Sequence, residues 1–378
     1  MRGLEASATD ALDRRLLRDS PRPIAVALSG GGDSLALTLI ADAWARACGR
    51  ELLILTVDHR LQAEGAAWTE ACAAIAERLG RPFRALAWEG DKPATGVPAA
   101  ARRARHGLLA EAAREASARI ILMGHTRDDL IETAAMRAAG STTPDPREWS
   151  PSPVWPQGRG AFLLRPLLAA GRTELRDWLT ALGETWIDDP ANTDLRYARS
   201  RARVSPAALT PAGGAPEPHP SLDVVSTGGD LVLDRAAVRR ASAGELRRVI
   251  AMACVCAGGG ERLPSGSRVT RAADAIVGTG RFVSTLAGAR IEADGDRLRI
   301  AREPGEAARG GLQQLDLPAG QERVWDGRFA ITAHEPGLVV RAARNGDPVI
   351  EPAGAATVFP LVGDRFRAAV GLIPREPA

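Results

Sequence analysis

Two hydroxyl groups and one carboxylate surround three consecutive glycines in the segment Ser29-Gly30-Gly31-Gly32-Asp33-Ser34. The apolar run Ile24–Leu28 precedes this segment and is typical of a buried parallel strand. Leu35, Leu39 and Ile40 follow it at helical spacing. Glycines let backbone N–H groups approach a phosphate, and the N-terminus of a helix attracts an anion. The order of strand, glycine turn and helix therefore predicts a phosphate site, which is not a Walker A loop because no lysine follows the last glycine.

Polar side chains also follow the next two apolar runs. Asp58 and His59 come directly after Leu52–Val57, and Lys92 comes shortly after Phe83–Trp88. Because the carboxyl ends of parallel strands meet at one edge of a sheet, we expect Asp58 and His59 near a nucleotide bound at the glycine turn. The alternative interpretations are a merely polar strand end for Asp58 and His59 and a surface position for Lys92.

Three carboxylates, those of Asp128, Asp129 and Glu132, follow the apolar run Ile120–Met123. Asp129 and Glu132 are three residues apart, so both side chains project from one face of the first turn of a helix. Clustered carboxylates can hold Mg²⁺ or the ammonium group of an amino acid. Asp128 could instead cap the helix, since acids are favoured at helix N-termini. Capping requires only one acid, however, so we expect a functional cluster.

Two arginine-rich segments are candidates for binding phosphate groups. In the first, Arg102 and Arg105 share a helix face, and an anionic partner would relieve their mutual repulsion. The second, Leu195–Arg203, has a tyrosine and no acid, and it is the strongest candidate for binding an RNA backbone. Its four arginines are Arg196, Arg199, Arg201 and Arg203. A solvated basic face is the alternative for the first segment, and a basic linker helix for the second.

These motifs resemble those of known enzymes. S-G-G-x-D-S at the glycine turn resembles the signature of the PP-loop ATP pyrophosphatases, which cleave ATP to AMP and pyrophosphate. V-D-H-x-L from Val57, K-P from Lys92, H-T-x-D-D-x-x-E-T from His125 and D-P-x-N from Asp189 are similar to the motifs of one family in that superfamily, the tRNA(Ile)-lysidine synthetases. The resemblance at the level of motifs covers residues 24–203.

The sequence also departs from the family pattern. His106 stands where the family has tyrosine, and Ser200 where it has asparagine. The Pro-, Gly- and Ser-rich loop 137–160 is longer than the corresponding family segment. Trp149 and Trp155 in this loop could stack on unpaired bases or pack beneath the loop.

The resemblance implies a ligase that uses ATP and Mg²⁺. In this family the C2 carbonyl oxygen of the wobble cytidine in a CAU-anticodon tRNA(Ile) attacks the α-phosphorus of ATP. The ε-amine of free L-lysine then displaces AMP and gives lysidine. The four cysteines form no disulfide or zinc pattern, from which we expect a reducing cytoplasm, and we expect no membrane partner; a homodimer is left open.

The resemblance also implies roles for the candidate residues. The segment from Ser29 to Ser34, with Asp58 and His59, would bind ATP, and Asp33 would also hold Mg²⁺. Arg102 and Arg105 would stabilise the activated cytidine. The acids Asp128, Asp129 and Glu132 would receive lysine and its proton. Binding of tRNA would fall to Lys92, Arg196, Arg199, Arg201 and Arg203.

Two other functions are compatible with parts of the pattern. The first is a different PP-loop enzyme, either a tRNA cytidine thiolase or an amide-forming synthetase. A thiolase uses catalytic cysteines, usually with a C-x-x-C pair, which Cys48, Cys72, Cys254 and Cys256 do not form. An amide-forming synthetase normally carries a glutaminase or acceptor domain. The second is an RNA-binding protein with a degenerate nucleotide fold, which the intact glycine turn and acids disfavour.

Short apolar runs and amphipathic stretches alternate from residue 21 to about 140. This alternation predicts an α/β fold with a parallel sheet covered on both faces. The resemblance implies that this part of the chain is a Rossmann-like PP-loop domain. The expected strands are Ile24–Leu28, Leu52–Val57, Phe83–Trp88 and Ile120–Met123. The expected helices are Leu35–Cys48, Gly65–Leu79, Val97–Ala116 and Asp128–Ala139.

The length of 378 residues fits two or three domains. We expect a catalytic PP-loop domain at 1–205, a linker at 206–222, a mainly helical tRNA-binding domain at 223–310 and a small α/β or β-rich domain at 311–378. Asp294-Gly295 predicts a hairpin. No apolar run approaches the length of a membrane span, and the N-terminus lacks the apolar region of a secretory signal. The net charge of +3 is too small to indicate nucleic-acid binding by itself.

Overall fold

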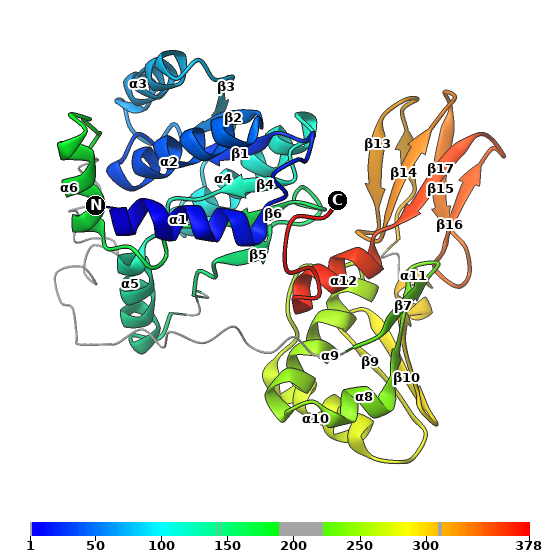
Figure 1. Ribbon diagram of the computed structural model, residues 1–378. Helices are drawn as coiled ribbons and strands as arrows, with labels where there is room; N and C mark the ends of the chain where they lie inside the picture. Colours follow the sequence, from blue (N-terminus) through cyan, green and yellow to red (C-terminus); the bar gives the residue numbers. More distant parts are fainter. Residues whose placement is uncertain (1, 142, 144, 189–221, 309–311) are drawn as a thin grey trace. The chain divides into compact units, whose positions relative to one another are not determined.

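The computed structural model describes residues 2–141, 143, 145–188, 222–308 and 312–378 (Figure 1). The chain forms two compact units, one of Met1–Glu217 with Pro374–Ala378 and the other of Pro218–Ile373. Each unit has its own hydrophobic core. None of the helices in the described ranges is both long and apolar enough to cross a membrane.

A six-stranded sheet forms the centre of the first unit. Its order is β3-β2-β1-β4-β6-β5, and all neighbouring strands are parallel except β5 and β6. The strands are β1 (Ile24–Ala27), β2 (Leu52–Asp58), β3 (Phe83–Ala87), β4 (Ile120–Leu122), β5 (Trp149–Pro151) and β6 (Phe162–Leu164). Each of the four predicted strands is present and ends within one residue of its expected position. The predicted parallel sheet is therefore confirmed.

Helices cover both faces of this sheet, as predicted. They are α1 (Arg2–Arg15), α2 (Gly32–Cys48), α3 (Gly65–Arg78), α4 (Val97–Glu115), α5 (Arg127–Ala138) and α6 (Arg172–Ala181). Figure 1 shows α1 and α2 side by side. Leu109 and Ala113 of α4 pack in one cluster with Leu53, Leu55 and Ile121 of the sheet. Strands that are buried on both faces need apolar side chains at nearly every position, which explains the continuous apolar runs in the sequence.

The second unit combines helices with antiparallel sheets. A five-stranded sheet has the order β7-β8-β11-β10-β9 and packs with α8, α9, α10 and α12. These elements are β7 (Val224–Thr227), β8 (Asp230–Asp234), α8 (Arg235–Arg240), α9 (Ala243–Ala257), α10 (Gly266–Val277), β9 (Phe282–Leu286), β10 (Ala289–Asp294), β11 (Arg297–Arg302) and α12 (Val362–Val370). The helices expected in 223–310 are thus accompanied by a sheet, of which only the β10–β11 hairpin at Asp294-Gly295 was predicted.

Two smaller sheets and a short helix complete the second unit. The sheets have the orders β12-β15-β16 and β13-β14-β17. The elements are α11 (Pro304–Ala308), β12 (Leu315–Leu317), β13 (Glu322–Trp325), β14 (Phe329–Ala333), β15 (Leu338–Ala342), β16 (Pro348–Glu351) and β17 (Ala356–Pro360). This part of the chain is the β-rich region that the sequence predicts.

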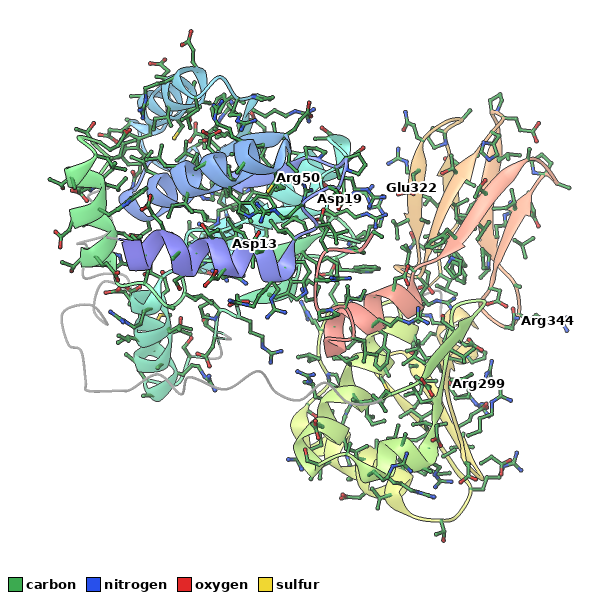
Figure 2. All side chains as sticks on the ribbon, viewed as in Figure 1. Asp13, Asp19, Arg50, Arg299, Glu322 and Arg344 are labelled. Carbon is green, nitrogen blue, oxygen red and sulfur yellow. The ribbon has the colours of Figure 1, made fainter. Side chains whose placement is uncertain are left out.

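The last residues of the chain belong to the first unit. Glu376 forms a bidentate ion pair with Arg50, with N–O distances of 2.7 and 2.9 Å, and both side chains are at most 1% exposed. Arg50, labelled in Figure 2, also donates to the carbonyls of Leu17 and Arg22. The backbone N–H of Glu376 donates to the carbonyl of Arg15. These contacts fasten the C-terminal segment to the residues that follow α1.

Candidate active site

The glycine turn joins β1 to α2, as the sequence predicts. Gly30 has φ +84°, and a Cβ atom there would lie 2.5 Å from Cδ1 of Ile187. The N–H of Ile187 donates to the carbonyl of Gly30 at 2.9 Å. Gly31 is the N-cap of α2 and has extended backbone. The glycines thus allow a tight turn, packed against Ile187, whose N–H groups lie at the start of a helix.

The hydroxyl of Ser34 holds this turn together. Ser34 is buried, and its hydroxyl donates to the carbonyl of Gly31 at 2.9 Å and accepts from the N–H of Ser29 at 3.1 Å. The hydroxyls of Ser29 and Ser34 are also 3.1 Å apart. In this structure Ser34 therefore shapes the loop, while Ser29 is exposed at its edge.

A close backbone approach brings the turn after β4 against the glycine turn. A Cβ atom on Gly124 would lie 3.0 Å from the carbonyl oxygen of Asp33 and from the backbone N of Ser34. Only glycine fits such an approach without displacing backbone. Because β1 and β4 are neighbours in the sheet, the N-termini of α2 and α5 lie together at the crevice where doubly wound sheets bind ligands.

Two of the three predicted acids stabilise helix N-termini. Asp129 forms a capping box with Thr126 at the start of α5, and its Oδ2 accepts from the Thr126 N–H at 2.9 Å. Asp128 accepts from the N–H of Arg172, the first residue of α6, at 2.8 Å. The capping interpretation of Asp128 therefore holds for α6 rather than for its own helix. Glu132 is 3% exposed and lies one turn further along α5.

Arg172 links these acids to the glycine turn. Its Nε donates to Oδ2 of Asp33 at 3.1 Å, and its Nη1 donates to Oε1 of Glu132 at 3.1 Å. Its Nη2 lies 3.9 Å from Oδ2 of Asp129. Arg172 was not among the site residues predicted from the sequence. Its position soon after the end of β6, at the edge of the sheet that carries the other motifs, is the signal that could have identified it.

The pKa shifts reflect this charge balance. Burial raises the pKa of Asp33 above its ordinary value, although the charge and hydrogen bond of Arg172 oppose the shift. Burial would lower the pKa of Arg172, but Asp33 and Glu132 raise it well above its ordinary value. Arg172 is therefore a permanent cation that favours ionised carboxylates around it.

A second group of residues gathers at the ends of β2 and β3. Asp58 accepts from the N–H of Arg60 at 2.8 Å, and the ring of His59 meets that of Trp88 edge to face at 6.2 Å. Burial and then the charge of Arg105 lower the pKa of His59, so the imidazole is neutral at neutral pH. Lys92 lies over the Trp88 ring, 4.0 Å from its centroid, and donates to the Trp88 carbonyl.

The predicted arginines of α4 lie beside a third, buried arginine. Arg165 is 4% exposed and donates to Nδ1 of His125 and to the carbonyl of Arg147. Burial, followed by the charges of Arg102 and Arg105, lowers the pKa of Arg165 to about 10. Concentrated positive charge of this kind suits a phosphate or the developing charge of an adenylated base. Arg165 was not predicted.

A pocket of about 560 Å³ adjoins Arg172 and Asp128. Its walls combine apolar and acidic side chains with the basic side chains of Arg127 and Arg172. They include Leu4, Ile131, Trp178, Glu174 and Asp177. Within the part of the chain that the structure describes, no group of three or more His, Cys, Asp or Glu side chains is arranged to hold a metal ion.

The remaining predicted residues have mixed outcomes. Trp149 lies in β5 and stacks on Phe162 of β6, with ring centroids 4.8 Å apart, which supports the packing interpretation. Cys254 and Cys256 are buried in the core of the second unit. Arg196, Arg199, Arg201 and Arg203 lie outside the described residues, so their proposed contact with RNA stays a prediction.

Comparison with known proteins identifies the family. Residues 4–208 match the PP-loop domain family. A tRNA(Ile)-lysidine synthase of Caulobacter vibrioides is 46% identical over 407 aligned positions, which cover 97% of this chain and 97% of that protein. The chain belongs to the tRNA(Ile)-lysidine synthase family.

Other members of the tRNA(Ile)-lysidine synthase family are also similar over most of their length. The protein of Hyphomonas neptunium is 36% identical, and the alignment covers 84% of this chain and 92% of that protein. The protein of Rhizobium meliloti is 34% identical, and the alignment covers 88% of this chain and 78% of that protein. The family resemblance that the motifs indicated is thus confirmed and extends beyond residue 203 into the second unit.

Proposed function

We propose that this protein joins L-lysine to the wobble cytidine of a CAU-anticodon tRNA(Ile), with ATP as the source of energy. The observation that carries the proposal is the cluster of Asp33, Glu132 and Arg172, which lies between the glycine turn and α5 in a chain of this family. The reaction belongs in the cytoplasm, where tRNA, ATP and free lysine occur together.

In the first step the C2 carbonyl oxygen of the cytidine attacks the α-phosphorus of ATP. The bond between the α-phosphorus and the bridging oxygen breaks, and pyrophosphate leaves with both electrons of that bond. N–H groups of the turn from Gly30 to Ser34 would hold the phosphates at the N-terminus of α2. Arg102 and Arg105 would stabilise the cytidine as it accepts the adenylyl group.

In the second step the ε-amine of lysine attacks C2 of the adenylated cytidine. A C–N bond forms, the C–O bond to the adenylate breaks, and AMP leaves. The lysine ammonium must first lose a proton, and the buried carboxylate of Glu132 would accept it.

Mg²⁺ fits this site as a companion of the ATP phosphates. It usually binds through one or two carboxylates together with substrate phosphates and water, and when bound it neutralises charge on the leaving pyrophosphate. Asp33 is the carboxylate closest to the glycine turn and would contribute to such a site. The fit therefore rests on Asp33 together with the nucleotide.

An assay with purified protein, ATP, Mg²⁺, labelled lysine and CAU-anticodon tRNA(Ile) tests the proposal. We expect lysine to be incorporated into the tRNA, and incorporation to disappear when the wobble cytidine is changed. Release of pyrophosphate without incorporation of lysine would indicate a different PP-loop reaction, such as thiolation of a tRNA base or amide formation.

A further inference from the structure

Arg172 contacts the four acidic residues that the motifs place at the glycine turn and at the start of α5. Its guanidinium reaches Asp33 of α2 and Glu132 of α5, each at 3.1 Å, and lies 3.9 Å from Asp129. Its backbone N–H donates to Asp128. One residue at the start of α6 therefore joins the glycine turn to the acids of α5.

These carboxylates lie in a poorly solvated part of the site. The side chains of Asp33, Asp129 and Glu132 are 20%, 10% and 4% exposed, so water screens their repulsion weakly. The guanidinium lies between these like charges and offsets their repulsion.

The shape of arginine suits this position better than that of lysine. The guanidinium is planar and carries its donors in a fixed fork, and here Nε and Nη1 each serve a different helix. A lysine ammonium would supply the charge at a single point. It would therefore restore the charge of the cluster without fixing the separation between Asp33 and Glu132.

We propose that Arg172 is a positioning residue that holds the carboxylates of Asp33 and Glu132 at a fixed separation. This inference rests on the proposed function, in which Asp33 serves the adenylation step and Glu132 serves the lysine transfer. Arg172 thereby sets the geometry of both steps without contacting the reacting atoms. The docking of α6 does not require the guanidinium, because Asp128 holds the backbone N–H of the same residue.

The experiment compares Arg172→Met and Arg172→Lys in the full-length protein. Pyrophosphate release and lysine incorporation are measured separately, each as a function of lysine and tRNA concentration. We expect Arg172→Met to lower kcat of both reactions by about 10- to 100-fold, as for other residues that orient the ligands of a site. We expect Arg172→Lys to recover part of kcat, and the KM for tRNA to stay unchanged in both variants.

Arg78→Met is the matched control. Arg78 forms a bidentate pair with Glu184 in the same unit, with both distances 2.7 Å, but it is half-exposed and lies outside the site. It should leave both reactions unchanged. A folded Arg172→Met protein with wild-type kcat for both reactions would overturn the proposal.

Other outcomes are equally decisive. If Arg172→Met does not fold, Arg172→Lys is used alone. A wild-type kcat in that variant would overturn the proposal, because a lysine supplies the charge without the fork that fixes the separation. If wild-type protein releases pyrophosphate but incorporates no lysine, the proposed function fails. The effect of Arg172→Met on pyrophosphate release then still decides whether the residue positions Asp33.

Discussion

At the scale of single residues, the site depends on glycines that leave room for other groups. Gly30 combines a left-handed backbone conformation with close contact to Ile187. Gly30→Ala should therefore cost on the order of 1–2 kcal/mol for the conformation, and more for the displaced Ile187 side chain. Because the turn itself must shift, we expect a higher KM for ATP, measured by pyrophosphate release.

Gly49→Ala is the control for this prediction. Gly49 also has a positive φ, +69°, but a Cβ atom there would meet nothing within 4 Å. The Gly49→Ala protein should therefore lose stability through backbone strain alone and keep the wild-type KM for ATP. Equal values of KM in Gly30→Ala and wild type would show that the contact with Ile187 does not shape the nucleotide site.

His106 makes the first unit sensitive to acid. Burial, followed by the charges of Arg105, Arg102 and Arg165, lowers its pKa to about 2, below the value of roughly 6.5 in an unfolded chain. Between these values the unfolded state binds the proton and the folded state does not, so stability is lost as the pH falls below 6.5. At pH 5 the loss from this group should be about 2 kcal/mol.

His106→Tyr tests this pH dependence. Tyrosine is the residue that the family motif carries at this position, and it does not titrate in this range. The midpoint of urea unfolding of the first unit, compared at pH 7 and pH 5, should fall less in the variant than in wild type. An equal fall in both proteins would assign the acid sensitivity to other groups.

At the scale of elements, the N-terminus of α5 connects stability to the site. Thr126 and Asp129 form its capping box, and Thr126→Ala should cost about 1 kcal/mol. Amide exchange in the first turn of α5 should therefore become about fivefold faster. The substitution also removes the Thr126 hydroxyl that donates to Oδ2 of Asp129, and this oxygen lies 3.9 Å from Nη2 of Arg172. We therefore expect kcat to fall as well.

Ser242→Ala provides the comparison. Ser242 and Glu245 form a capping box at the start of α9, in the second unit. Its loss should speed exchange in α9 to a similar degree and leave kcat for pyrophosphate release unchanged. A loss of activity in both variants would mean that capping acts only through global stability.

Elements in the first unit could be predicted because their patterns are local. A stretch of about 20 residues is enough to recognise the continuous apolar runs of β1 and β2 and the glycine turn between strand and helix. The strand β5 has only three residues, and its stabilising stack joins Trp149 to Phe162 in a later strand. The sheet of the second unit depends on distant pairings such as Ile300 with Leu231, which periodicity does not reveal.

The same limit applies to the site. Spacing along the chain identified Asp33, Asp129 and Glu132, since each follows a predicted strand. Arg172 and Arg165 were missed because their partners lie 139 and 40 residues away in sequence. Sheet order decides such contacts, and short motifs carry no information about it.

At the scale of the whole molecule, the ion pair of Arg50 and Glu376 joins the C-terminal segment to the rest of the first unit. Both side chains are almost completely buried, so removing one leaves an uncompensated charge inside the protein. Glu376→Ala should therefore destabilise the first unit by roughly 3–5 kcal/mol. Thermal unfolding followed by tryptophan fluorescence would show this as a lower midpoint.

Two controls sharpen this prediction. Arg14→Ala breaks a pair with Glu148 in which Arg14 is 57% exposed, and should cost less than about 1 kcal/mol. The double variant Arg50→Met with Glu376→Ala removes both buried charges and should be more stable than Glu376→Ala alone. A Glu376→Ala protein as stable as wild type would contradict the importance of the pair.

This ion pair also has a consequence for folding during synthesis on the ribosome. Glu376 leaves the ribosome 326 residues after Arg50. At about 5–20 residues per second, the interval is roughly 16 to 65 seconds. During that time the nascent first unit lacks the partner for an arginine that its fold buries. The whole second unit is synthesised in the meantime, so a chain cut short there also weakens the unit in which we place the chemistry.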